Sequence, residues 1–139
     1  MSNQVIFNWE KLLSAKRRSK DKEKDMPDIW ACARTEIERD YDRIVFSAPT
    51  RRLANKTQVF PMEEHDSIRT RLTHSNEVSN LARGAGVSLC CNGFFNNKNI
   101  DRDRLIRDIP ALLSTIGIVH DMGNPPFGHQ GEKAIQDWF

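Results

Sequence analysis

The chain has 139 residues, which is a usual size for one domain. Hydrophobic residues make up 38% of the sequence and charged residues 29%, and the mean hydropathy is −0.62. No apolar run approaches the roughly 18 residues of a membrane span, and three Trp and seven Phe argue against disorder. The net charge of +2 is too balanced to indicate a nucleic-acid coat or a membrane patch.

The cysteines and the start of the chain bear on the cellular compartment. Cys32, Cys90 and Cys91 are odd in number, and no C-x-x-C pair occurs. This pattern is neither a disulfide framework nor a zinc ribbon. Residues 1–5 lack the charged start and apolar core of a signal peptide. We therefore expect a cytoplasmic protein with reduced thiols.

Two helices are predicted before residue 46. Apolar spacing predicts a helix from about Trp9–Lys20, and the charged stretch 16–25 is expected to be a solvated helix end or arm, with a break at Pro27. Thr35 and Glu38 form a T-x-x-E capping box, which predicts a second helix start. The inward residues of that helix should be Ile37, Tyr41, Ile44 and Val45.

Proline and glycine punctuate the middle of the chain. Pro49 suits a helix start, and a short helix should follow it and end before Pro61. The next helix should begin near Ser67, and Gly84 and Gly86 should weaken it. Its apolar side is predicted to carry Leu72, Val78 and Leu81.

The last part of the chain also reads as helical. A loop is expected over 92–99, after which Asp101 could cap a helix. The nearly all-apolar segment 111–120, which follows Pro110, predicts a buried helix. A final helix should start near His129. Because no stretch shows the period-two alternation of a half-buried strand, the predicted fold class is all-α.

We expect a single domain over 1–139, with a helix and charged arm in 1–27 and a helical core in 28–139. The final helix carries an apolar stripe, defined here as Ile135, Trp138 and Phe139. Large apolar residues of this kind need a partner surface. The sequence is therefore expected to be the N-terminal part of a longer protein.

Two histidines are candidate metal ligands. His120 follows an apolar run, where an unpaired imidazole is costly, and Asp121 comes directly after it. Imidazole and carboxylate together suit Mg²⁺ or a divalent first-row ion. His74 lies on a separate predicted helix, so three ligands from two helices predict an open metal site.

His129 and Glu132 lie three residues apart, on one face of the predicted final helix. The carboxylate could orient the imidazole for general acid or base catalysis. The alternative is an ordinary helix start, where the dipole favours a first-turn Glu. Arg71 lies three residues before His74 and could hold a phosphate beside the metal. Solvated surface charge is the alternative reading of Arg71.

Several blocks of the sequence carry a family resemblance. They are Asn8–Ser14, Glu38–Ile44, Arg51–Leu53, Lys56–Pro61, Arg69–Ser75 and His120–Glu132. In these blocks the chain resembles the N-terminal part of the bacterial deoxyguanosine triphosphate triphosphohydrolases, which are HD-domain phosphohydrolases. The similarity extends over nearly the whole chain.

The resemblance implies the N-terminal portion of a helical HD-type fold that binds its metal through the pattern H…HD…D. His74, His120 and Asp121 match the first three ligands, and the final Asp is absent from this chain. His129 and Glu132 match the catalytic His and its carboxylate partner. The positions that match substrate-binding residues are Gln58 near the deoxyribose, Arg71 at a phosphate and Asn124 lining the pocket.

The resemblance also implies an activity: hydrolysis of dGTP or another dNTP to the deoxynucleoside and triphosphate, with Mg²⁺ or Mn²⁺. Members are usually homo-oligomers, and some respond to nucleotides or single-stranded DNA. With its fourth ligand absent, this chain alone is expected to have little activity. The alternatives are another HD-type nucleotide phosphohydrolase and an inactive fragment that binds nucleotide or DNA.

Overall fold

The computed structural model describes residues 8–14, 33–56, 69–96, 100–125 and 127–139. These residues form helices and turns without a β-strand, so the predicted all-α class is confirmed. No helix in these ranges is both long and apolar enough to cross a bilayer. The charged stretch 16–25 and the break at Pro27 lie outside the described residues.

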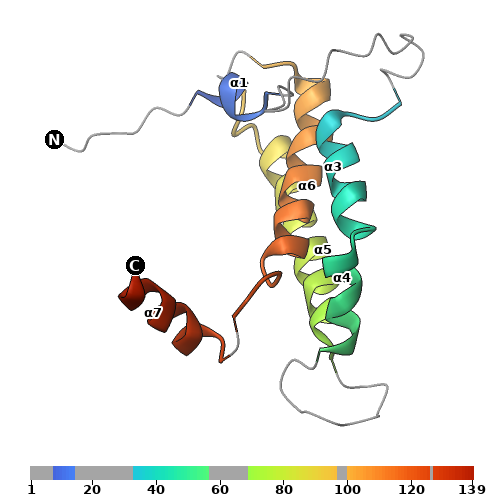
Figure 1. The fold of residues 1–139 in the computed structure, drawn as a ribbon. Helices are drawn as coiled ribbons and strands as arrows, with labels where there is room; N and C mark the ends of the chain where they lie inside the picture. Colours follow the sequence, from blue (N-terminus) through green and yellow to red (C-terminus); the bar gives the residue numbers. More distant parts are fainter. Residues whose placement is uncertain (1–7, 15–32, 57–68, 97–99, 126) are drawn as a thin grey trace, which may run out of the picture.

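The fold is built around two long helices, α5 (Arg71–Cys91) and α6 (Arg102–Val119), which pack along their lengths (Figure 1). They run antiparallel, since Gly117 near the end of α6 lies against Ser79 near the start of α5. A Cβ atom built on Gly117 would lie 2.5 Å from the Ser79 Cα. Only glycine therefore allows this approach. Beside it, the Ser79 hydroxyl donates to the Ser114 carbonyl at 2.9 Å.

The helix boundaries differ from the predictions in two places. The helix expected near Ser67 begins at Arg71, because the Thr70 hydroxyl accepts a hydrogen bond from the Thr73 amide and caps it there. The helix expected after Asp101 and the one expected over 111–120 are a single helix, α6, which continues through Pro110. Gly86 has no side chain, so the backbone of Pro110 can pack closely against α5 at this point.

Other expectations for these helices are partly confirmed. Asp101 caps α6 by accepting from the Asp103 amide. Helix α5 runs through both of its glycines without ending. Leu81 was expected on the apolar side, but it is 75% exposed, and that expectation is wrong. Cys90 and Cys91 end α5 as free thiols, and burial raises the pKa of Cys90 above its ordinary value.

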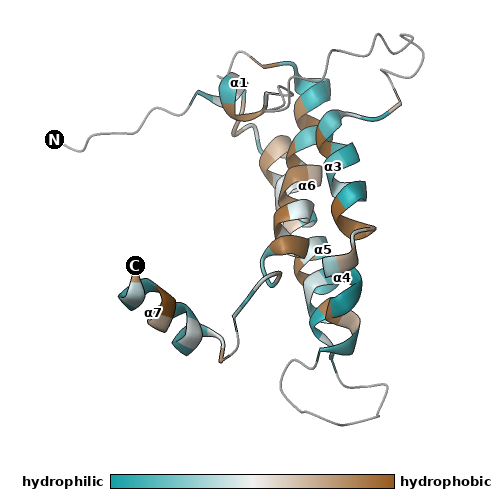
Figure 2. Ribbon diagram, viewed as in Figure 1, coloured by the Kyte–Doolittle hydropathy of each residue, from teal (hydrophilic) through white to brown (hydrophobic). Residues whose placement is uncertain are grey.

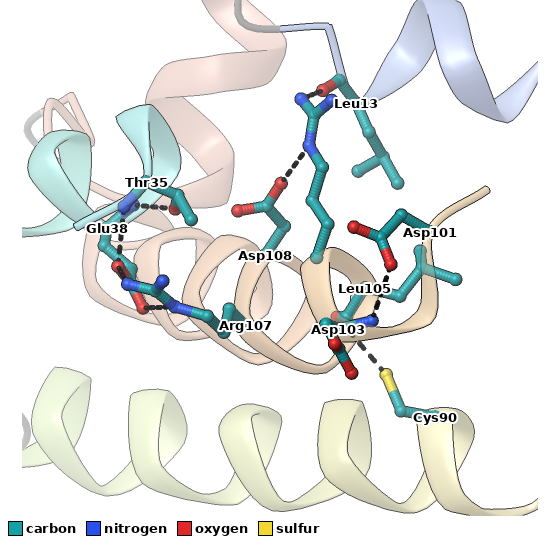
Figure 3. Close-up of polar contacts among 10 residues, drawn as sticks. Leu13, Thr35, Glu38, Cys90, Asp101, Asp103, Leu105, Arg107 and Asp108 are labelled. Atoms are coloured by element: carbon teal, nitrogen blue, oxygen red, sulfur yellow. Dashed lines mark hydrogen bonds and ion pairs between the residues drawn. The ribbon is translucent and has the colours of Figure 1, made fainter. Parts of the chain in front are cut away.

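Helix α3 (Glu36–Val45) packs against α6 and begins at the predicted capping box. The Thr35 hydroxyl accepts from the Glu38 amide, while the Glu38 carboxylate accepts from the Thr35 amide at 2.7 Å. Arg107 of α6 adds two hydrogen bonds to the same carboxylate (Figure 3). The four residues expected to point inward are half-buried rather than buried. The short helix after Pro49 is confirmed as α4 (Ala48–Arg52), followed by the 3₁₀ helix η1 (Leu53–Asn55).

The Glu38 carboxylate predicts an acid-sensitive link between α3 and α6. Burial raises its pKa, but the hydrogen bonds from Arg107 and Thr35 and the charges of Arg107 and Arg34 outweigh this and bring the pKa below the ordinary 4.5. A lowered pKa means that the stabilisation is present above pH 4.5 and is lost as the pH falls through the folded-state pKa. Glu38→Gln should lower the free energy of unfolding by about 1 kcal/mol near neutral pH.

Urea unfolding of both proteins at neutral pH and at about pH 3 checks this prediction. The difference between wild type and Glu38→Gln should shrink in acid, because the wild-type carboxylate loses its charge as the pH falls through its lowered folded-state pKa. A difference of the same size at both pH values would show that the ion pair with Arg107 contributes nothing to stability.

Helix α1 (Trp9–Leu12) is much shorter than the predicted Trp9–Lys20 helix, because Leu13 already has non-helical backbone angles. Asn8 caps its start by accepting from the Lys11 amide. Leu13 belongs to the main apolar core, and the Arg104 guanidinium of α6 holds its carbonyl at 2.8 Å. The core residues are Leu13, Cys90, Phe95, Leu105 and Ile109.

Helix α7 (His129–Trp138) begins where it was predicted, after Gly128 in a left-handed conformation. It stands apart from the α5–α6 pair (Figure 1). The apolar stripe on α7 is open, with Trp138 81% and Phe139 100% exposed. In Figure 2 the ribbon of α7 carries both hydrophilic and hydrophobic colours. The expected need for a partner surface thus agrees with the exposure of these side chains.

Candidate functional site

A cavity of about 530 Å³ lies where the start of α5 meets the turn that follows α6. The antiparallel packing creates this meeting point, since it places the N-terminal end of one helix beside the C-terminal end of the other. The wall has both polar and apolar surface and carries charges of both signs. Its lining residues include Lys56, Arg71, Asp121, Asn124, Phe127 and Gly128.

The two predicted histidine ligands lie side by side near this cavity. The His74 and His120 rings have centroids 5.4 Å apart, and their planes meet at 68°. His120 Nδ1–H donates to the Gly117 carbonyl at 2.7 Å. A carbonyl can only accept, so the proton is fixed on Nδ1 and the lone pair of Nε2 is left for another partner.

Asp121, which directly follows His120 in the chain, is buried and is held from two directions. Its Oδ1 accepts from Arg71 Nη1 at 2.8 Å and from Asn124 Nδ2 at 2.5 Å. Its Oδ2 is also buried but has no hydrogen-bond partner. A buried carboxylate oxygen without a partner is costly. The carboxylate is therefore half satisfied, and Oδ2 is suited to a cation.

These features fit a metal site, although the structure does not gather a complete one. Among the described residues, no three His, Cys, Asp or Glu side chains form a metal-binding group. The structure brings His74 to His120 and, separately, Asp121 to Arg71. The free Nε2 of His120 and the unpartnered Oδ2 of Asp121 are the donor types that a divalent ion takes. The metal site of His74, His120 and Asp121 stays a prediction, which these two free ligand atoms support.

The predicted acid–base pair is formed on α7. His129 Nδ1–H donates to Glu132 Oε2 at 3.1 Å, so the carboxylate orients the ring. The His129 side chain is 98% exposed, and His129 is not among the residues that line the cavity. The structure therefore forms the pair, but it does not bring the pair to the other site residues.

The remaining substrate-binding predictions have different outcomes. Arg71 and Asn124 both line the cavity, as expected for residues that contact a substrate. Gln58 lies outside the described residues. The roles of all three stay predictions.

Two lining residues were not singled out by the sequence analysis. Lys56 adds a cation to the cavity, and its carbonyl accepts from the Arg71 amide at 2.9 Å. Phe127 is 90% exposed and has a φ of 68°, which is unusual for a residue other than glycine. A clue to Phe127 was available in the sequence, because a large aromatic residue between Pro126 and Gly128 is out of place in an ordinary turn.

Comparison with known proteins gives a consistent set of relatives. The chain is 45% identical over 142 residues to a deoxyguanosinetriphosphate triphosphohydrolase-like protein of Listeria monocytogenes, covering 96% of this chain and 28% of that protein. A protein of the same description from Synechocystis is 42% identical over 96% of this chain and 29% of its own length. The deoxyguanosinetriphosphate triphosphohydrolase of Yersinia pestis is 46% identical over 74% of this chain and 21% of its own length.

The alignments cover only part of each relative. This chain spans less than a third of the length of the curated relatives it matches. No protein-family profile matches the sequence.

Proposed function

We propose that this chain, which is related over nearly its whole length to the deoxyguanosinetriphosphate triphosphohydrolase-like proteins, supplies metal-binding and phosphate-binding residues to a dNTP hydrolase. The observation that carries the proposal is the half-satisfied carboxylate of Asp121, which accepts from Arg71 at the cavity wall and directly follows His120 in the chain. The proposed reaction converts dGTP, or another dNTP, to the deoxynucleoside and triphosphate.

The cations of the cavity would bind the phosphate chain. Arg71 is only partly neutralised, because one of its N–H groups donates to Asp121 and its side chain is 29% exposed. A guanidinium has five N–H donors, so most remain for phosphate oxygens. Lys56 adds a second positive charge on the same wall. Together they favour a ligand with several negative charges over a neutral one.

A divalent ion, Mg²⁺ or Mn²⁺, would be held by His74, His120 and Asp121. The fit rests on the Nε2 lone pair of His120 and the unpartnered Oδ2 of Asp121. When bound, the ion supplies positive charge that polarises a phosphoryl oxygen. The protein's own part is to hold these donors in place through the Gly117 carbonyl and Arg71.

In this proposal, water attacks the α-phosphorus, the bond from phosphorus to O5′ breaks, and O5′ takes up a proton. Glu132 fixes a proton on Nδ1 of His129, so Nε2 is the atom that exchanges a proton with the water or with O5′. The exposure of His129 leaves its ring free to meet a substrate that enters from solvent. The substrate would have to reach from the cavity to α7.

A product assay tests the proposal. The full gene product that carries this chain, incubated with dGTP and Mn²⁺, should release deoxyguanosine and triphosphate in equal amounts. Release of dGMP and pyrophosphate would contradict the proposed bond cleavage. Hydrolysis of other nucleotide esters in place of dNTPs would identify another HD-type phosphohydrolase, and nucleotide binding without turnover would identify a binding protein.

Sedimentation with and without single-stranded DNA tests the predicted homo-oligomer and DNA partner.

Glu132→Gln should lower turnover by roughly 10²–10⁴-fold, the usual contribution of acid–base catalysis, while Mn²⁺ stays bound. The glutamine keeps the size of the side chain but lacks the charge that orients and stabilises the His129 imidazolium. Asp137→Asn is the matched control, since it removes a carboxylate from the exposed surface of the same helix. If both variants turned over at the same rate, the pair on α7 would have no catalytic role.

A further inference from the structure

We infer that Asn124 is a positioning residue: its side-chain amide holds Oδ1 of Asp121 so that Oδ2 is presented to a cation. The inference rests on the proposed metal-dependent function and deepens it. It gives Asn124 a role that acts through Asp121, whereas the family resemblance places Asn124 only on the pocket wall.

The hydrogen bonds of Asp121 carry the argument. Arg71 Nη1 and Asn124 Nδ2 both donate to the same oxygen, Oδ1, at 2.8 and 2.5 Å. The other oxygen is buried and has no partner, and the Asp121 side chain is only 8% exposed. A carboxylate that served only to neutralise Arg71 could use both oxygens on its guanidinium. The observed asymmetry leaves one oxygen for a further ligand.

The two donors come from different parts of the fold. Arg71 opens α5, whereas Asn124 lies in the turn after α6, three residues from Asp121. Two donors that approach one oxygen from separate elements restrict rotation of the carboxylate, which a single donor does not. Groups that orient a metal-binding carboxylate in this way raise metal affinity.

The turn after α6 places Asn124 for this purpose. The Met122 amide donates to the Val119 carbonyl at 2.9 Å, and Gly123 has a φ of 77°. A left-handed residue at this point reverses the chain so that the next side chain, Asn124, returns toward Asp121. The amide donor is also the right group chemically. An aspartate at 124 would be an acceptor facing another acceptor.

Mn²⁺ titration followed by electron paramagnetic resonance tests the inference on the full gene product. Asn124→Ala should weaken Mn²⁺ binding by roughly 10–100-fold, the range for loss of a group that supports a metal ligand. Asn124→Ser keeps a hydrogen-bond donor at a shorter reach and should recover part of the loss. Asn80→Ala, at an exposed asparagine of α5, is the control and should bind Mn²⁺ like the wild type.

The outcomes distinguish this inference from the proposed function. Equal Mn²⁺ affinity in wild type and Asn124→Ala overturns the positioning role, while dGTP hydrolysis by the wild type keeps the proposed function. A raised KM with unchanged Mn²⁺ affinity assigns Asn124 to substrate contact and also overturns it. Failure of the wild type to bind Mn²⁺ overturns both. If Asn124→Ala does not fold, Asn124→Ser decides: Mn²⁺ binding weakened, but by less than about 100-fold, supports the positioning role, and wild-type Mn²⁺ affinity overturns it.

Discussion

Asp121→Ala is expected to abolish stoichiometric Mn²⁺ binding and to lower dGTP turnover by roughly 10⁴-fold or more, since metal-ion catalysis contributes several kcal/mol. The substitution removes the buried oxygen that has no protein partner. It also removes the anion that holds Arg71 at the cavity. Elemental analysis of the purified full gene product and a product assay measure the two effects.

Two further variants show whether the effect belongs to the metal. His120→Ala should give the same loss of Mn²⁺, because its Nε2 is the other donor that the structure leaves free. Asp137→Ala removes a carboxylate from exposed α7 and should leave the metal content unchanged. Wild-type metal content in both Asp121→Ala and His120→Ala would show that the metal site is assigned to the wrong residues.

Gly117→Ala is expected to destabilise the fold strongly. The added Cβ would lie 2.5 Å from Cα and 2.8 Å from the backbone nitrogen of Ser79. Backbone atoms cannot rotate away as a flexible side chain can, so α5 and α6 would have to separate. Overpacking of this kind costs about 1–3 kcal/mol or more, and each kcal/mol lowers the Tm of a domain of this size by roughly 3–5 °C.

Gly84→Ala is the matched control for this prediction. It lies inside α5, and a Cβ atom built there meets nothing within 4 Å. Alanine at this site should raise stability by roughly 0.5–1 kcal/mol, because glycine is the poorer helix former. Thermal unfolding of the two variants should therefore shift in opposite directions. A Gly117→Ala protein as stable as the wild type would show that the helix contact can relax without cost.

Local sequence signals predicted the parts of this fold that depend on a few neighbouring residues. The capping box at Thr35, the cap at Asp101 and the helix start at His129 all appear where they were expected. In each case a side chain or a backbone angle within three or four residues decides the outcome. Such signals are readable without knowledge of the rest of the chain.

Interactions between distant residues were not readable in the same way. Pro110 lacks the amide proton that a helix interior uses, yet α6 continues through it where it packs against Gly86. The Trp9–Lys20 spacing predicts a long helix, yet Leu13 leaves the helix and enters a core shared with Leu105.

The candidate site shows the same division. The apolar run before them indicated a buried imidazole and carboxylate: Asp121 is buried as expected, but His120 is exposed, because it follows the last turn of α6. The contact from Arg71 to Asp121 joins residues fifty positions apart, and no spacing rule predicts it. The exposure of His129 could not be predicted either, because the helical pattern of α7 does not indicate where that helix lies relative to the others.

The antiparallel pairing of α5 and α6 has a consequence for the order in which the molecule assembles. Only the ten residues 92–101 separate the two helices, so their contacts close a short loop. Contacts between segments close in sequence form quickly, and during synthesis the earlier part of a chain can fold first. We expect the contacts of His74 with His120 and of Arg71 with Asp121 to form as soon as this helical hairpin closes. His129 and Glu132 emerge later on α7, so these contacts can precede the pairing of His129 with Glu132.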